Sequence, residues 1–126
     1  MLENAPAFSG FSVQNLDEAK QFYGNTLGLK LEEQPGMGFH ILANGTKVFV
    51  YDKPNHEPAG FTVLNFAVDD IDAAVDALTA QGIVFATYDG LHQDAKGIAR
   101  GKAAGQGPDI AWFTDPSGNV LAVLEN

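Results

Sequence analysis

Cysteine is absent from the 126 residues of this chain. Disulfide bonds, thiolate metal sites, cysteine nucleophiles and thiol redox chemistry are therefore excluded together. Any chemistry that the protein performs must come from oxygen and nitrogen groups, or from the shape of an apolar surface.

Basic residues and long apolar runs are also scarce. Seven Lys and Arg stand against sixteen Asp and Glu, which gives a formal net charge of −9. Because such a surface repels phosphate backbones and carries no basic stripe, we expect no nucleic-acid partner. No apolar stretch reaches the length of about 18 residues that a membrane span needs, and the first residues do not read as a signal peptide. We therefore expect no membrane contact and a cytoplasmic protein.

An internal repeat organises the chain. The segment FSVQNLDEA at residues 11–19 returns as FAVDDIDAA at residues 66–74. In each copy an alternating apolar run ends at a residue that can cap a helix, so helices are predicted to begin at Asn15 and Asp70. The apolar stripes of these helices end at Gly28 and Gly82, as is common at helix C-termini.

After each of these glycines the apolar period changes to two, which indicates strands. The predicted strands are residues 29–33, 39–42 and 47–52, and then 83–87, 110–114 and 120–124. Each half then reads β-α-β-β-β, with module one at about 7–53 and module two at about 61–125. The linker is too short to separate independent domains, so we expect one domain over 1–126. The predicted fold class is α+β, with two paired βαβββ modules whose curved mixed sheets form a cup.

Strand alternation predicts which side chains line this cup. Phe11 and Val13 belong to the helix-facing set, and the opposite set faces inward. The predicted apolar wall consists of Phe8, Phe49, Tyr51, Val63 and Trp112. Small-molecule pockets are usually built from such walls, although the core of a dimer is built in the same way.

The polar candidates lie on a strand and in a long irregular segment. Residues 88–107 lie outside the repeat and contain five glycines and three of the seven basic residues. A segment of this length is typical of a lid or binding loop, with a disordered insertion as the alternative. Within it, Arg100 is the best anchor for a carboxylate or phosphate, and His92 adds a second polar group. His40 would serve as a general base if a carboxylate lay beside it.

The motifs resemble those of the vicinal oxygen chelate superfamily, which includes glyoxalase I, extradiol dioxygenases, fosfomycin-resistance enzymes and bleomycin-binding resistance proteins. The resemblance is carried by the paired modules, by FY at residues 22–23 followed by LGL at 27–29, by VDDID at 68–72 and by FTDPSGN at 113–119. It covers about residues 7–125. Because these motifs are helix caps, core stripes and a turn, they specify the fold more closely than the activity.

The resemblance also says where a metal would be held. Metal-dependent members carry a His or Gln near the start of each module's first strand and a Glu on its last strand. The matching positions here are Phe8, Val63, Phe49 and Ala122. None of these side chains offers an oxygen or nitrogen donor, so the resemblance implies neither a metal nor another cofactor.

The leading interpretation is a bleomycin-resistance-like homodimer that binds a small organic molecule in the apolar cup without a metal, with residues 88–107 as a lid. The ligand would be cationic or aromatic, or would carry an anionic group that meets the basic residues of the loop. One alternative is a lyase or isomerase of the same superfamily that uses His40 or His92 as its base. A second alternative is a relocated metal site built on His40, His56 or His92. A third is a structural or partner-binding module whose cup is filled by a second chain.

Overall fold

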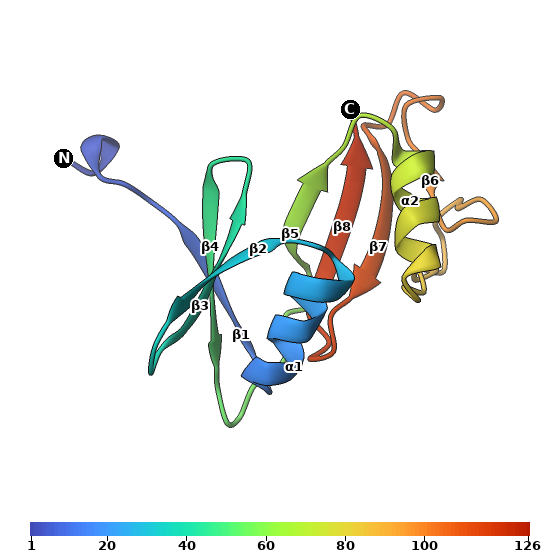
Figure 1. The fold of residues 1–126 in the computed structure, drawn as a ribbon. Helices are drawn as coiled ribbons and strands as arrows, with labels where there is room; N and C mark the ends of the chain where they lie inside the picture. The colour runs from blue at the N-terminus through green and yellow to red at the C-terminus, as the bar shows by residue number, and fades with distance from the viewer. The chain divides into compact units, whose positions relative to one another are not determined.

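The computed structural model describes all 126 residues, and the chain divides into two compact units, Met1–Pro58 and Ala59–Asn126. Each unit contains one four-stranded mixed sheet and one main helix (Figure 1). The predicted α+β fold class is therefore confirmed. No helix combines the length and the apolar character that a membrane crossing would require.

Unit 1 carries the first β-α-β-β-β module behind a short 3-10 helix, η1. Its elements are η1 (Leu2–Asn4), β1 (Ser9–Val13), α1 (Leu16–Lys20), the π-helical turn η2 (Gln21–Thr26), β2 (Lys30–Gln34), β3 (Gly38–Ala43) and β4 (Thr46–Asp52). The strand order is β1-β4-β3-β2. β1 runs parallel to β4, and the other neighbours are antiparallel.

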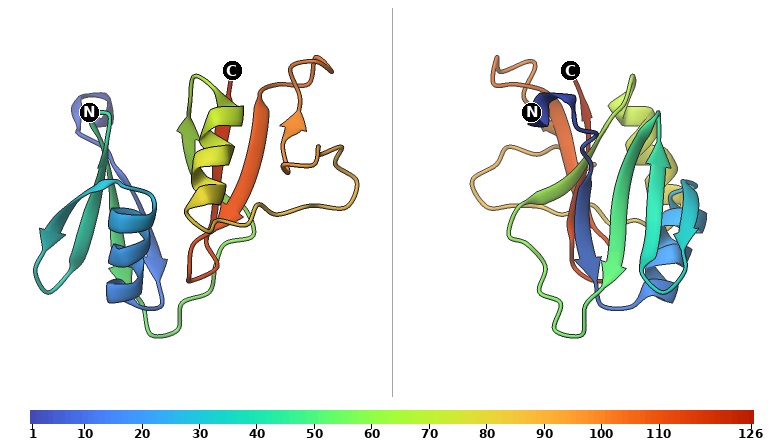
Figure 2. Two further views of the ribbon diagram at one scale, coloured as in Figure 1. Left: turned by 45° about the vertical axis from the view of Figure 1, so that its right-hand side comes forward. Right: turned by 90° about the vertical axis from the view of Figure 1, so that its left-hand side faces the viewer.

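Unit 2 repeats this arrangement. Its elements are β5 (Thr62–Ala67), α2 (Ile71–Ala80), β6 (Ala99–Arg100), β7 (Asp109–Thr114) and β8 (Val120–Glu125). The strand order β5-β8-β7-β6 matches that of unit 1, again with the first strand parallel to the last. α2 packs against β7 and β8 (Figure 2).

Both predicted helix starts are confirmed. The side chain of Asn15 accepts a hydrogen bond from the backbone N–H of Glu18 at 2.9 Å, and that of Asp70 accepts one from Ala73 at 3.1 Å. Each cap satisfies a backbone donor that the helix itself leaves free, which stabilises the helix by about 1 kcal/mol.

The helix of unit 1 covers one face of its sheet through aromatic packing. Tyr23 is fully buried, and its ring lies 5.9 Å from that of Phe11 and 6.5 Å from that of Phe39. The sequence predicted one regular helix up to Gly28, but the chain follows a π-helical path from Gln21. This wider turn leaves the adjacent Phe22 and Tyr23 both buried.

The DPSGN motif of unit 2 forms a buried turn before β8. Asp115 and Asn119 are 4% and 2% exposed. The Asp115 carboxylate accepts hydrogen bonds of 2.9 Å from the backbone N–H groups of Ser117 and Asn119 and from the Asn119 amide. The motif is therefore a hydrogen-bonded structural turn, which explains why it indicates the fold and not the reaction.

The predicted strand at residues 83–87 is wrong. This stretch has no strand assignment, and its bond to the sheet runs from the Ala86 N–H to the Trp112 carbonyl at 2.8 Å. The fourth strand is β6, inside the segment 88–107 that we expected to be irregular.

A side chain accounts for this difference. The Gln93 carboxamide accepts from the Tyr88 N–H at 2.7 Å and donates to the carbonyls of Ala86 and Gly97 at 2.9 and 2.8 Å. These bonds replace some of the backbone hydrogen bonds that a neighbouring strand would make. We call Gln93 with its three backbone partners the Gln93 clip. The long segment is thereby tied to the stretch before it.

Candidate functional site

The face of the unit 1 sheet opposite the helix carries most of the predicted wall, and we call it the open face. In the strand register Phe49 of β4 pairs with Gly10 of β1 and with His40 of β3. His40 in turn pairs with Glu32 of β2. Because directly paired residues project to the same side of a sheet, these four positions form one row across the open face.

Ring contacts continue this row. The Phe8 and His40 rings lie 6.0 Å apart and nearly perpendicular, and His40 lies 5.3 Å from Phe49. Phe49 and Tyr51 stack at 5.8 Å with an interplanar angle of 19°. The structure therefore brings together four of the predicted site residues, Phe8, His40, Phe49 and Tyr51, which we call the aromatic row. Its two ends are open, since Phe8 is 67% and Tyr51 37% exposed.

His40 is the polar member of the aromatic row. Its side chain is 17% exposed, and the nearest charged atom to Nδ1 is Glu32 Oε1 at 3.8 Å. Nδ1 itself is buried without a hydrogen-bond partner. Lys47 Nζ lies 3.5 Å from the same Glu32 oxygen. The carboxylate that the sequence analysis required beside His40 is therefore present, at slightly more than hydrogen-bond distance.

The other polar candidates gather in unit 2. His92, Arg100 and Trp112 line one pocket of about 270 Å³. The rest of its lining comes from Gly90, Leu91, Ala99, Gly101, Ala104, Gln106, Pro108 and Ile110. Tyr88 stands edge-on to Trp112 at 5.5 Å. The sequence did not indicate Tyr88 or Gln93, because only the three-dimensional path of residues 86–97 brings Tyr88 to Trp112 and Gln93 to the backbone of Tyr88.

Arg100 is held by carboxylates of its own unit. Its guanidinium donates two hydrogen bonds to Asp72, at 2.8 and 3.0 Å, and one to Asp94 at 3.0 Å. The hydrogen bond from Arg100 lowers the pKa of Asp72, and the same bond raises the pKa of Arg100. Its role as an anchor for an anionic ligand stays a prediction, but these partners offset the charge on which that role relied.

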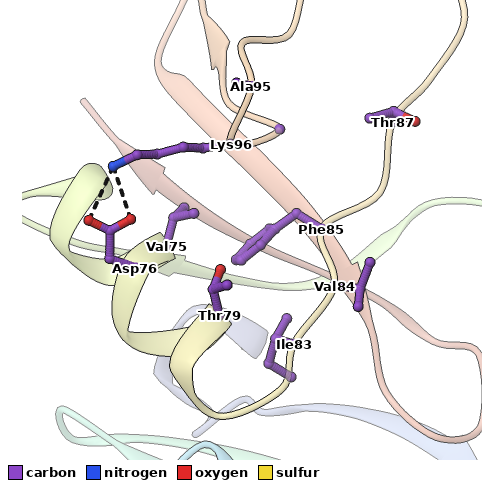
Figure 3. Close-up of a pocket in the computed structure, with 10 residues that line it drawn as sticks. Val75, Asp76, Thr79, Ile83, Val84, Phe85, Thr87, Ala95 and Lys96 are labelled. Atoms are coloured by element: carbon purple, nitrogen blue, oxygen red, sulfur yellow. Dashed lines mark hydrogen bonds and ion pairs between the residues drawn. The ribbon is translucent and has the colours of Figure 1, made fainter.

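The remaining basic residues of the long segment are paired as well. Lys96 Nζ lies 2.9 Å from Asp76 of α2, and Lys102 bonds to Glu125 at the end of β8. Figure 3 shows the Lys96–Asp76 pair beside a second pocket of about 400 Å³ between α2 and residues 83–87. The segment is therefore fastened to α2 and β8, and a lid motion would have to break these ion pairs.

The open face of unit 2 repeats the row of unit 1 with different residues. Ala122 of β8 pairs with Asn65 of β5 and with Trp112 of β7. Ala122 therefore matches Phe49, Asn65 matches Gly10, and Trp112 matches His40. Val63 lies where the register shifts between Thr62 and Leu64. Simple alternation therefore does not place its side chain, and its inward orientation stays a prediction.

The residues do not fit a metal ion. At three of the positions where the resemblance implies metal ligands, the side chains present are those of Phe8, Phe49 and Ala122, which are hydrocarbon. The structure contains no group of three or more His, Asp or Glu residues that could hold an ion, so no such group supports the relocated site. His56 instead places Nδ1 2.6 Å from Ser12 Oγ.

Solved structures share this fold over the whole chain. A glyoxalase family protein from Bacillus anthracis has a TM-score of 0.70 and 21% identity, and covers 100% of this chain and 99% of its own. TnmS3, an antibiotic binding protein from Streptomyces sp. CB03234, has a TM-score of 0.66 and 24% identity over 97% of both chains. Lactoylglutathione lyase from Agrobacterium tumefaciens has a TM-score of 0.65 and 19% identity, and covers 98% of this chain and 94% of its own.

These identities establish a common fold and do not transfer a substrate. Among curated proteins none matches this chain. The family model of the Glyoxalase/Bleomycin resistance protein/Dioxygenase superfamily matches residues 8–123, nearly the full length. The chain therefore belongs to the glyoxalase/bleomycin resistance protein/dioxygenase superfamily.

Proposed function

We propose that this protein binds a planar aromatic molecule on its aromatic row and does so without a metal ion. The observation that carries the proposal is the continuous set of ring contacts from Phe8 to Tyr51 on the open face. Flat rings favour offset stacking and edge-on contacts, each worth about 0.5–1.5 kcal/mol beyond the apolar area that they bury. A planar ligand would add one more ring to a stack that already exists.

The donor positions support the metal-free part of the proposal. Phe49 belongs to the aromatic row itself, so the residue at the position where the resemblance implies a carboxylate ligand supplies a ring contact instead. This favours a stacking surface over an ion site. The structure also contains no alternative cluster of donors from which an ion could be held.

The charge of the chain and one structural neighbour bear on the ligand class. A net charge of −9 favours cationic over anionic ligands, and aromatic faces attract cations. A neighbour of the same fold is described as an antibiotic binding protein. These observations favour a planar organic compound, neutral or cationic, as the ligand.

We further propose that the protein acts as a homodimer. Light scattering would test this oligomeric state.

Calorimetric titration of the EDTA-dialysed protein tests this function. Three probes of similar size cover the charge classes: 2-naphthol, 2-naphthoic acid and a cationic acridinium dye. Phe49→Leu removes a ring but keeps an apolar side chain, so we expect its dissociation constants to rise about 2- to 13-fold, as the loss of one ring contact predicts. Met37→Leu is the matched control, because Met37 is exposed and lies outside the aromatic row. No heat with any probe, or equal affinity in both variants, would refute the proposal.

A second candidate function is a lyase or isomerase of the same superfamily. The Glu32 carboxylate near His40 Nδ1 favours it, because a carboxylate in that position orients an imidazole for proton transfer. Turnover of a carbonyl substrate that survives in both His40→Gln and His92→Gln would remove this candidate, since one of these residues is the base that it requires.

A further inference from the structure

His40 can accept a proton from a bound molecule without becoming an isolated charge. Its Nδ1 is buried and faces Glu32 Oε1 at 3.8 Å. The carboxylate favours the tautomer in which Nδ1 carries the hydrogen. Nε2 then carries the lone pair, and it is neither hydrogen-bonded in the protein nor among the buried polar atoms without a partner.

The surroundings of Nε2 are aromatic. The rings of Phe8 and Phe49 flank the imidazole, and the charged groups near it are Glu32 of β2 and, beyond that carboxylate, Lys47 of β4. A ligand ring that lies against Phe8 or Phe49 would carry its substituents close to the imidazole edge. The group best matched to an Nε2 lone pair is a hydroxyl attached directly to such a ring.

We propose that the aromatic row selects aromatic hydroxyl compounds whose hydroxyl is acidified by an electron-withdrawing ring substituent, such as nitrophenols, and that His40 takes up their proton on binding. This inference rests on the proposed binding function. The ligand O–H bond breaks, its proton forms a bond to Nε2, and the Nδ1–H donates to the Glu32 carboxylate. The complex then holds a phenolate beside an imidazolium, with no change in the number of protons or in total charge.

This exchange reconciles an anionic ligand with an acidic protein. A free phenolate would be repelled by the net charge of −9. A neutral phenol is not repelled, and after transfer its charge is balanced by the imidazolium beside it. The long Glu32–His40 separation is compatible with this proton transfer, because hydrogen bonds around a proton acceptor often shorten only when the ligand is bound.

The test compares 4-nitrophenol with 4-nitroanisole, which differ by the proton that is transferred. At a pH where free 4-nitrophenol is mostly protonated, the wild-type protein should produce the phenolate absorption band and bind the phenol at least about tenfold more tightly than the methyl ether. His40→Phe keeps an aromatic ring and should abolish both the band and the preference for the phenol. Glu32→Gln should weaken the band, and Glu33→Gln, whose partner is Lys20, is the matched control that should not.

The outcomes separate this inference from the function on which it rests. Binding of both probes with equal affinity and no phenolate band overturns the inference and leaves the aromatic binding function intact. A band of equal strength in the wild-type protein and in His40→Phe also overturns it, since another group would then hold the proton. Binding of neither probe overturns the proposed function and the inference together. Thermal unfolding of each variant shows whether the fold is retained.

Discussion

The Gln93 clip should hold the unit 2 pocket in shape. Gln93→Met keeps the length and volume of the side chain but removes all three of its hydrogen bonds, to Tyr88, Ala86 and Gly97. A hydrogen bond of this kind contributes about 0.5–1.5 kcal/mol net. The substitution should therefore lower the free energy of unfolding of unit 2 by about 1.5–4.5 kcal/mol.

Trp112 reports on this unit directly. It is the single Trp of the chain and accepts the Ala86 N–H bond through its carbonyl beside the clip. Denaturant unfolding followed by Trp fluorescence should show the loss, and hydrogen exchange at the Tyr88 amide should accelerate because its acceptor is gone. Gln81→Met is the matched control, since Gln81 is exposed at the end of α2.

The result that would refute this reasoning is a Gln93→Met protein within about 0.5 kcal/mol of the wild type, the range typical of neutral surface changes. Unchanged exchange at Tyr88 would refute it independently. Either result would mean that packing, and not the carboxamide, holds residues 86–97.

Two further predictions concern the stability of unit 2. Asp115→Ala leaves three donors, two of them buried, without this acceptor, so it should cost at least about 3 kcal/mol in denaturant unfolding, whereas the exposed Asp89→Ala should cost almost nothing. The hydrogen bonds from Arg100 and Lys102 lower the pKa values of Asp72 and Glu125 in the folded state. Their contribution is therefore present above pH about 4.5 and is lost as the pH falls through the lowered values. Arg100→Gln should make the acid decline in Tm shallower, and an unchanged pH profile would contradict this account.

Local patterns predicted the elements whose causes are local. The caps at Asn15 and Asp70 depend on residues three positions apart, and they were found correctly. Alternation along the strands also predicted that Phe8, Phe49 and Tyr51 share a face, but it did not place His40 beside them. Phe49 and His40 then meet through a register that a hairpin imposes.

The sequence was less informative where distant contacts or irregular backbone decide. Residues 83–87 carry a strand pattern, but the Gln93 carboxamide takes up bonds that a neighbouring strand would make. The side chain of Val63 could not be placed by alternation, because the register of β5 shifts between Thr62 and Leu64 and no residue there signals the shift. The ion pair of Arg100 could not be foreseen, because its partner Asp72 lies 28 residues earlier in the chain.

Metal dependence of ligand binding tests the central claim most directly. The protein would be stripped of metal, its metal content measured by mass spectrometry, and 2-naphthol titrated by calorimetry before and after addition of Ni²⁺, Zn²⁺, Mn²⁺ or Fe²⁺. We predict binding by the stripped protein with the same Kd in every condition and a Tm that ignores all four ions. Binding that requires a stoichiometric ion, together with a Tm that this ion raises, would contradict the account.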